Sequence, residues 1–304
     1  MFIGNSRVNN FFEKAVVSGS LAQVYCLSGM DRVGKRTLAV RLASRLLGVD
    51  PEKIYLYPDF YYLNRGIDEK TGKERKEISV NQIRLLRSFL QNQSWYGGWR
   101  IIVIDDAEFL NEESGNALLK NLEEPGEKTL FFLLTKNDDL LLPTIRSRSE
   151  IWQLNPVDED EIEAGLVKLG CEGERARRIT YLSSGRPGRA IEFYNNEDRL
   201  QEWEEETQRW RGLWKTPLYE RLKILEGIVG EKNETERKEI HLQKILDIWT
   251  EEGRRMLCEQ TKTINDREKL GVLIKTIDSL GDAQKMLEQN INLKMVMEKI
   301  MLQF

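Results

Sequence analysis

The residues from Gly29 to Thr37, GMDRVGKRT, have the types and spacing that bind phosphate groups. Gly29, Gly34 and Lys35 match the pattern GxxxxGK[ST], in which backbone N–H groups wrap the phosphates and the lysine reaches the terminal one. The hydroxyl after the lysine ligates magnesium in that pattern, but here Arg36 stands there and Thr37 is displaced, about 100° further around a helix axis. We therefore expect nucleotide binding without efficient hydrolysis. A strand-to-helix turn that binds no ligand is the alternative.

A pair of carboxylates forms a second candidate group. Asp105 and Asp106 directly follow Ile101–Ile104, a run of β-branched aliphatic residues typical of a strand buried on both faces. A buried strand that delivers acids to its carboxyl end is how a phosphate-binding α/β domain holds a metal ion beside a nucleotide. Asp105 is thus the candidate magnesium contact if ATP binds.

Polar residues also follow a second apolar run, Leu130–Leu134. Thr135 and Asn137 stand at the end of this run, and Arg146 and Arg148 come next, in the segment LPTIRSRS. Two such arginines without other motifs around them are usually solvated surface residues.

The elements that must position these groups alternate between strand and helix. Continuous apolar runs predict strands at Val24–Ser28, Ile101–Ile104 and Leu130–Thr135. Helical spacing of apolar residues predicts helices at Phe2–Ser18, Thr37–Leu47, from Ile78 through Leu90, and from the N-cap Asn111 to Pro125. The pattern indicates an α/β fold with a parallel sheet flanked by helices. The aromatic cluster of the tyrosine-rich segment 48–72 is expected to pack on the sheet, with a nucleic-acid stacking platform as the alternative, and Asp68–Glu77 is expected to form a polar loop.

From Leu154 onward the apolar spacing becomes helical throughout. Three short helices are expected up to residue 196, and the remainder is expected to be all-helical, with a charged break at Glu231–Glu239. His241, the only histidine, has no second ligand or nucleophile nearby in the sequence, so it is assigned no chemistry.

Two segments carry a resemblance to a known family. The run NALLKNLEEP, Asn116–Pro125, after a strand ending in acids, resembles bacterial sliding-clamp loaders, most closely the delta-prime type of DNA polymerase III subunit. Leu142–Ser149 resembles their SRC signature, with Ser149 in place of the cysteine. The resemblance implies an AAA+ P-loop α/β domain over residues 1–155, a small helical lid over 156–196 and a helical collar for oligomerisation over 197–304.

The resemblance also implies roles for residues outside the loop. Arg148 matches the arginine finger, a planar cation that neutralises charge developing on a neighbouring subunit's ATP. Thr135 or Asn137 matches the sensor of the terminal phosphate, and spacing does not decide between them. Active members carry a nucleotide-touching arginine in the third lid helix, where this chain has Gly188, with Arg189 one residue beyond.

Further departures from the family pattern bear on catalysis and metal binding. Asp106 stands where an active ATPase has glutamate, and its carboxylate is shorter by one methylene; displacements of about 1 Å can lower a rate on the order of a hundredfold. The four-cysteine zinc module of many relatives is absent, so no zinc is expected. Arg84 and Arg87 lie on a helix that faces DNA in clamp loaders and are candidate phosphate contacts, although a solvated basic face is equally compatible.

The implied function is that of a delta-prime-like subunit, a structural and regulatory member of a ring that places the sliding clamp on primed DNA. Its partners would be gamma/tau and delta subunits, with ATP bound weakly or without hydrolysis and with magnesium only if ATP binds. An active gamma-type subunit or a helicase-loading AAA+ ATPase is the alternative. A nucleotide-sensing switch unrelated to replication is a third.

Composition sets further bounds. The 304 residues carry a net charge of −4, and residues 1–155 hold 21 Lys and Arg against 20 Asp and Glu, whereas the remainder holds 25 against 30. Without a basic excess, DNA contact is expected to be shared with partner subunits. Cys26, Cys171 and Cys258 lack metal-site spacing, and no leader-like or membrane-spanning apolar run is present, so a cytoplasmic protein without membrane contact is expected.

Overall fold

The chain forms two compact units, residues 1–195 and 196–304. The computed structural model describes residues 2–68, 74–229, 235–263, 267–288 and 293–304. Among these residues, no helix is both long enough and apolar enough to cross a membrane.

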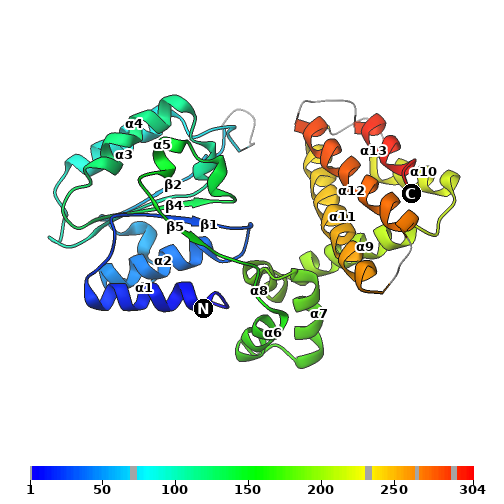
Figure 1. Cartoon of the computed structure of the whole chain (residues 1–304), viewed down its shortest axis with the longest axis horizontal. Coiled ribbons are helices and arrows are strands. Elements are labelled where there is room, and N and C mark those ends of the chain that lie inside the picture. Colours follow the sequence, from blue (N-terminus) through cyan, green and yellow to red (C-terminus); the bar gives the residue numbers. More distant parts are fainter. Residues whose placement is uncertain (1, 69–73, 230–234, 264–266, 289–292) are drawn as a thin grey trace. The chain divides into compact units, whose positions relative to one another are not determined.

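The first unit is built on a five-stranded parallel sheet with the strand order β2-β3-β4-β1-β5 (Figure 1). Its strands are β1 (Val24–Ser28), β2 (Phe60–Leu63), β3 (Arg100–Ile104), β4 (Thr129–Thr135) and β5 (Glu150–Gln153). The three strands predicted from apolar runs are the central ones, because only a strand covered on both faces is apolar at every position. The edge strands β2 and β5 were not predicted.

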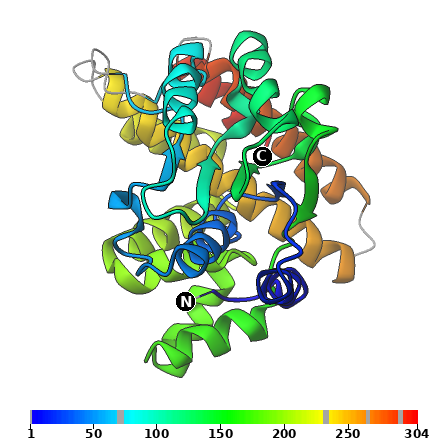
Figure 2. The same cartoon turned by 90° about the vertical axis from the view of Figure 1, so that its left-hand side faces the viewer.

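Helices cover both faces of this sheet. One face carries α1 (Ser6–Ser18) and α2 (Lys35–Leu47), and the other carries α3 (Val80–Gln91), α4 (Glu112–Glu123) and α5 (Pro143–Arg146) (Figure 1). Successive strand residues point to opposite faces, so Leu27 packs in the core under α2 whereas its neighbour Cys26 packs in the core under α3 and α4. Figure 2, in which α1 is seen nearly end-on, shows the same unit from the side.

Local signals fix where the helices begin. The side chain of Asn111 accepts a hydrogen bond from the N–H of Ser114 at 2.8 Å and so starts α4 as predicted. Ser79 and Gln82 form a reciprocal capping box at the start of α3. These caps fix the first residues of α3 and α4.

Three short helices complete the first unit: α6 (Glu159–Lys168), α7 (Gly173–Ser183) and α8 (Pro187–Asn195). Ile162 of α6, Ile179 of α7 and Ala190 of α8 are fully buried. Helical spacing of such residues predicted all three helices.

The second unit is helical throughout its described residues. Its helices are α9 (Glu197–Leu213), α10 (Leu218–Val229), α11 (Thr235–Thr263), α12 (Arg267–Glu288) and α13 (Leu293–Met301). Trp210 and Trp249 lie at the centre of its core with ring centroids 5.5 Å apart. The predicted charged break at 231–239 is wrong for residues 235–239, which belong to α11, and its other residues lie outside the described ones.

Candidate phosphate-loop site

The phosphate loop links the end of β1 to the start of α2, and two glycines shape it. Gly29 has φ +149°, and a Cβ atom there would lie 2.3 Å from the carbonyl oxygen of Leu154. Gly34 has φ +112° and is the N-cap of α2, with the ring of Phe2 3.0 Å from its Cβ position. Backbone conformation and close neighbours thus both require glycine at these two positions.

Lys35 lies inside the loop and is only 8% exposed. Its Nζ donates hydrogen bonds to the carbonyl oxygen of Gly29 and, at 3.0 Å, to that of Met30. Burial lowers the pKa of the ammonium group, and the nearby carboxylate of Asp31 acts in the opposite direction. The ammonium group of Lys35 is thus held by carbonyl oxygens of the loop itself.

Arg36, beside it, is linked through a tyrosine to the first of the two strand-end acids. Its Nη1 donates to the hydroxyl of Tyr62 at 3.2 Å, and that hydroxyl donates to Oδ2 of Asp105 at 2.5 Å. Burial, then the hydrogen bond to Asp105, raises the pKa of Tyr62, which stays protonated as the donor of the pair. Thr37 is exposed and lines a cavity of about 260 Å³ with Arg36, Val40, Arg41, Pro51 and Tyr55.

The second strand-end acid, Asp106, is paired with an arginine from the end of β2. Nε of Arg65 lies 3.1 Å from Oδ2 of Asp106, and the same guanidinium lies 3.9 Å from the ring centroid of Phe109. Nη2 of Arg65 also reaches Glu74 at 2.6 Å. Asp106 itself has φ +58°, a conformation uncommon for a residue with a side chain. Its carboxylate is thus held by Arg65.

The two candidate sensors, Thr135 and Asn137, lie beside the loop, but both side chains form hydrogen bonds with nearby backbone groups. The N–H of Gly29 donates to the carbonyl oxygen of Thr135 at 3.2 Å, which places this strand end against the loop. Oγ1 of Thr135 donates to the carbonyl oxygen of Asn137 at 2.9 Å, and Oδ1 of Asn137 accepts from the N–H of Asp139 at 3.1 Å. Thr135 is buried and Asn137 is exposed.

Asp138 joins the loop strand to Arg146. It accepts hydrogen bonds from Ser28 Oγ at 3.1 Å and from Arg146 Nε at 2.9 Å. Burial acts to raise the pKa of this carboxyl, but the bonds from Ser28 and Arg146 outweigh it and lower the pKa. Arg146 also reaches Asp139 at 3.1 Å. These contacts give Arg146 a structural role.

Arg148 lies near the amino-terminal ends of the strands, whereas the loop of its own chain lies at their carboxyl ends. It precedes β5, whose first residue Glu150 pairs with Tyr25 near the start of β1, whereas the loop follows the end of β1. Because the two strands are parallel, the two sites are separated by roughly the length of a five-residue strand, about 16 Å. Nη2 of Arg148 lies 2.5 Å from Oε1 of Glu123, and its side chain is 35% exposed.

Helix α8 packs against the loop at its first turn. The N–H of Gly188 donates to the carbonyl oxygen of Arg32 at 2.8 Å, and the side chain of Arg32 forms an ion pair with Glu192. A Cβ atom at residue 188 would lie 2.8 Å from the same carbonyl oxygen, which explains the glycine. Arg189 is 7% exposed.

The remaining predicted residues lie apart from the loop. Arg84 is exposed on α3, on the other face of the sheet from α2, and Arg87 on the same helix is half-buried. The structure therefore gathers Gly29, Gly34, Lys35, Arg36 and Asp105 in one place, and leaves Arg84, Arg87 and Arg148 outside it.

Sequence reasoning missed Tyr62, Arg65 and Arg32. Tyr62 and Asp105 are 43 residues apart, and Arg65 and Asp106 are 41 apart. The only available signal was the run FYYL, whose aromatic residues are typical of a strand and which would have placed Tyr62 beside the acids.

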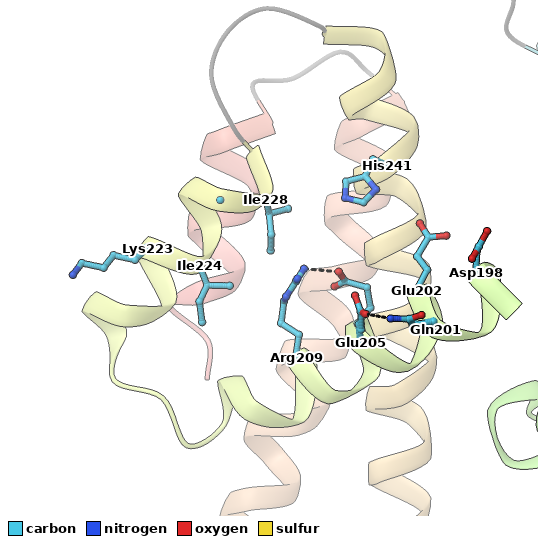
Figure 3. Close-up of a pocket in the computed structure, with 11 residues that line it drawn as sticks. Asp198, Gln201, Glu202, Glu205, Arg209, Lys223, Ile224, Ile228 and His241 are labelled. Carbon is cyan, nitrogen blue, oxygen red and sulfur yellow. Dashed lines mark hydrogen bonds and ion pairs between the residues drawn. The ribbon is translucent and has the colours of Figure 1, made fainter. Parts of the chain in front are cut away.

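A larger cavity lies in the second unit (Figure 3). Its volume is about 670 Å³, and acidic residues dominate the polar part of its lining. The residues that line it are Asp198, Gln201, Glu202, Glu205, Glu206, Arg209, Lys223, Ile224, Gly227, Ile228 and His241. None of these was predicted as a site residue.

One family model matches residues within the first unit. The family model described as "DNA polymerase III, delta subunit" matches residues 4–158. DNA polymerase III subunit delta' of Escherichia coli K12 is 31% identical over 143 residues, which cover 47% of this chain and 41% of that protein. The gamma subunit of Buchnera aphidicola subsp. Baizongia pistaciae is 28% identical over 172 residues, covering 55% of this chain and 46% of that protein. The chain thus spans less than half the length of these relatives.

A solved structure resembles the chain over nearly its whole length. The gamma subunit-related protein of Thermotoga maritima has a TM-score of 0.53 and 18% identity, with 98% of this chain and 97% of that one covered. At this identity the likeness shows a shared fold.

Proposed function

The chain belongs to the protein family described as DNA polymerase III, delta subunit, and we propose that it works as a delta-prime-like subunit of a clamp-loader ring. Its fold is the predicted one, an AAA+ α/β domain followed by helical parts. In the proposed role it is a structural and regulatory member of the ring, with gamma/tau and delta subunits as neighbours. The ring places the sliding clamp on primed DNA. Relatives named delta', gamma and tau support this assignment.

The observation that carries the proposal is the position of Arg148. This arginine is partly exposed and lies about one strand length from the phosphate loop of its own chain. A guanidinium in that position is too far to act on a nucleotide in its own loop, but it is accessible to a neighbouring subunit. A planar cation supplied from outside stabilises the charge that develops on the phosphoryl group during transfer. We therefore assign Arg148 as an arginine finger that acts on a neighbour's ATP.

Little or no ATP hydrolysis is expected from the chain itself. Arg36 replaces the magnesium-binding hydroxyl, and Asp106, the candidate for orienting the attacking water, is held by Arg65. Each departure removes a group that phosphoryl transfer requires. Under the same proposal, residues 156–196 form the lid, 197–304 form the collar, and Arg84 and Arg87 are candidate DNA contacts.

The test compares two variants in a reconstituted complex. The chain is mixed with candidate gamma and delta subunits, and the mass of the assembly and its ATPase rate are measured with Arg148→Ala and Glu123→Gln. Glu123→Gln is the matched control, because it removes the ion pair but keeps the guanidinium. We expect both variants to assemble and only Arg148→Ala to lose ATPase activity, by about a thousandfold at the affected site. Unchanged activity in Arg148→Ala would remove the finger assignment.

An active gamma-type ATPase is the second candidate. Gly29, Gly34 and Lys35 are retained in the loop, and gamma subunits are among the similar proteins. The purified chain decides between the two. Turnover on the order of 1 per second or faster would favour the active ATPase, and absence of turnover together with co-assembly supports the delta-prime-like role.

A further inference from the structure

Arg36 stands where a phosphate loop has its magnesium-binding hydroxyl. Hydrogen bonds connect it to Asp105, the acid that would hold the same ion. Arg36 Nη1 donates to Tyr62 Oη at 3.2 Å, and Tyr62 Oη donates to Asp105 Oδ2 at 2.5 Å. The three residues come from the start of α2, from β2 and from the end of β3. The two hydrogen bonds thus connect the start of α2, next to the loop, to the strand-end acid Asp105.

Magnesium does not fit this arrangement. The ion requires oxygen ligands in near-octahedral geometry at about 2.0–2.1 Å, whereas Arg36 offers only N–H donors and a permanent positive charge. Both oxygens of Asp105 are already engaged, Oδ2 by Tyr62 and Oδ1 by the N–H of Asp106 at 3.1 Å. In the described part of the chain, no group of three or more His, Cys, Asp or Glu residues could hold a metal ion.

The same arrangement provides cationic donors for an anion. Gly34 is the N-cap of α2 and forms no side-chain cap, so the first N–H groups of this 13-residue helix have no side-chain acceptor from the cap and can donate to a phosphate. Lys35 and Arg36 place two cationic side chains at that end. Among its described partners Arg36 uses one of its five N–H donors, on Tyr62, which leaves donors that can bind phosphate oxygens in a bidentate manner.

We propose that Arg36 takes the place of the magnesium ion, and that the loop binds the phosphates of a nucleotide in metal-free form. Tyr62 and Asp105 are positioning residues that hold the guanidinium toward the loop. No metal then bridges the phosphates, so a bound nucleotide is retained without transfer. The inference deepens the proposed non-hydrolysing role and rests on it, but binding is measured on the isolated chain, so its outcome is separate from ring assembly.

Charge gives the expected order of affinities. A magnesium–nucleotide complex carries its own divalent cation, which would have to lie beside the Arg36 guanidinium. Like charges at such a distance repel. The wild-type chain should therefore bind ADP or ATP at least as tightly in EDTA as in excess Mg²⁺, whereas a magnesium-dependent loop binds far more weakly in EDTA.

The experiment is calorimetric titration of the full chain with ADP and with ATP, in EDTA and in excess Mg²⁺. Arg36→Thr should weaken metal-free binding about tenfold or more, the cost of losing charge-assisted hydrogen bonds. Arg36→Thr combined with Tyr62→Phe frees Asp105 and supplies a hydroxyl, and it should make binding stronger with Mg²⁺ than with EDTA. The matched control is Arg45→Ala, which removes an arginine further along α2 that pairs with Glu13 and should bind as the wild type does.

Several results would overturn the proposal. These are tighter binding with Mg²⁺ than with EDTA by the wild-type chain, no nucleotide binding under either condition, or full metal-free binding by Arg36→Thr. Thermal unfolding of each variant checks that it is folded. If Arg36→Thr does not fold, Arg36→Lys replaces it, because this variant keeps the charge but loses the bidentate geometry. Intermediate metal-free affinity supports the proposal, and wild-type affinity contradicts the role of the guanidinium.

Discussion

The N–H of Gly188 donates to the carbonyl oxygen of Arg32 at 2.8 Å, so the first turn of α8 lies directly on the phosphate loop. Arg32 has φ +63°, and its side chain forms an ion pair with Glu192 one turn further along α8. One loop residue thus contacts the helix through both its backbone and its side chain. The contact ties the conformation of the loop to the position of α8.

Replacing Gly188 with alanine should loosen this contact. The added Cβ would lie 2.8 Å from the carbonyl oxygen of Arg32, and backbone atoms on both sides would have to move apart. Overpacking of this kind costs about 1–3 kcal/mol. We expect faster amide hydrogen exchange in α8 and in the loop. Gly173→Ala in α7 is the control, because its Cβ would meet no atom within 4 Å; equal exchange in both variants would contradict the structural role of Gly188.

Asp138→Asn should lower the stability of the first unit at neutral pH but not in acid. The pKa of Asp138 is lowered in the folded state, so its ionised carboxylate contributes stability above the ordinary pKa of aspartate. That contribution is lost as the pH falls through the folded-state pKa. Urea unfolding at several pH values should therefore show wild type and variant converging in acid.

Asp139→Asn is the control for this prediction. The side chain of Asp139 is 69% exposed, so its ion pair with Arg146 is screened by water. The free energy of unfolding of Asp139→Asn should follow that of the wild type at each pH. A constant difference between Asp138→Asn and wild type at all pH values would contradict the assigned role of the Asp138 charge.

The sequence was sufficient for the central strands because their burial is visible as uninterrupted apolar runs. Leu130–Leu134 of β4 is apolar at every position and fully buried. The edge strand β5 reads EIWQ, with mostly exposed residues, so it carries little apolar signal. Its place in the sheet depends on pairing with β1, which is a long-range contact.

The candidate site was predicted only in part for the same physical reason. The glycines and Lys35 of the loop form a local pattern, because their spacing alone encodes the turn and the helix start. Arg36 is bound by Tyr62 of β2, and Asp106 is bound by Arg65, two residues after the end of that strand. No spacing in the sequence indicates which tyrosine or arginine of this region will reach them. The sequence showed that the magnesium ligand was missing, and the structure showed Tyr62 joining its replacement to Asp105.

Cys26 should be inert to thiol reagents in the native protein. Burial, followed by the negative charge of Asp138, raises the pKa of its thiol to about 12. The thiolate is the reactive form, so at pH 8 only about one molecule in ten thousand carries it.

Cys171 is also buried, whereas Cys258 is exposed. Titration with a chromogenic disulfide reagent should detect one fast thiol in the folded chain and three after denaturation. Loss of the fast thiol in Cys258→Ser identifies it, and a second fast thiol in that variant would contradict the prediction.

Glu206→Gln should change how the stability of the second unit depends on pH. Glu206 on α9 is 5% exposed and lines the cavity of the second unit, and burial raises its pKa although the charges of Arg209 and His241 oppose the shift. A carboxyl with a raised pKa stabilises the folded state below the ordinary glutamate pKa, and this contribution is lost as the pH rises through the folded-state value. Glutamine removes the titration, so the variant should gain stability relative to wild type across that interval. Trp210 and Trp249 lie in the core of this unit, so their fluorescence contributes to the unfolding signal. Glu205→Gln, an exposed neighbour on the same helix, should keep the wild-type pH profile. Parallel profiles for wild type and Glu206→Gln would show that the Glu206 carboxyl titrates alike in the folded and unfolded chains.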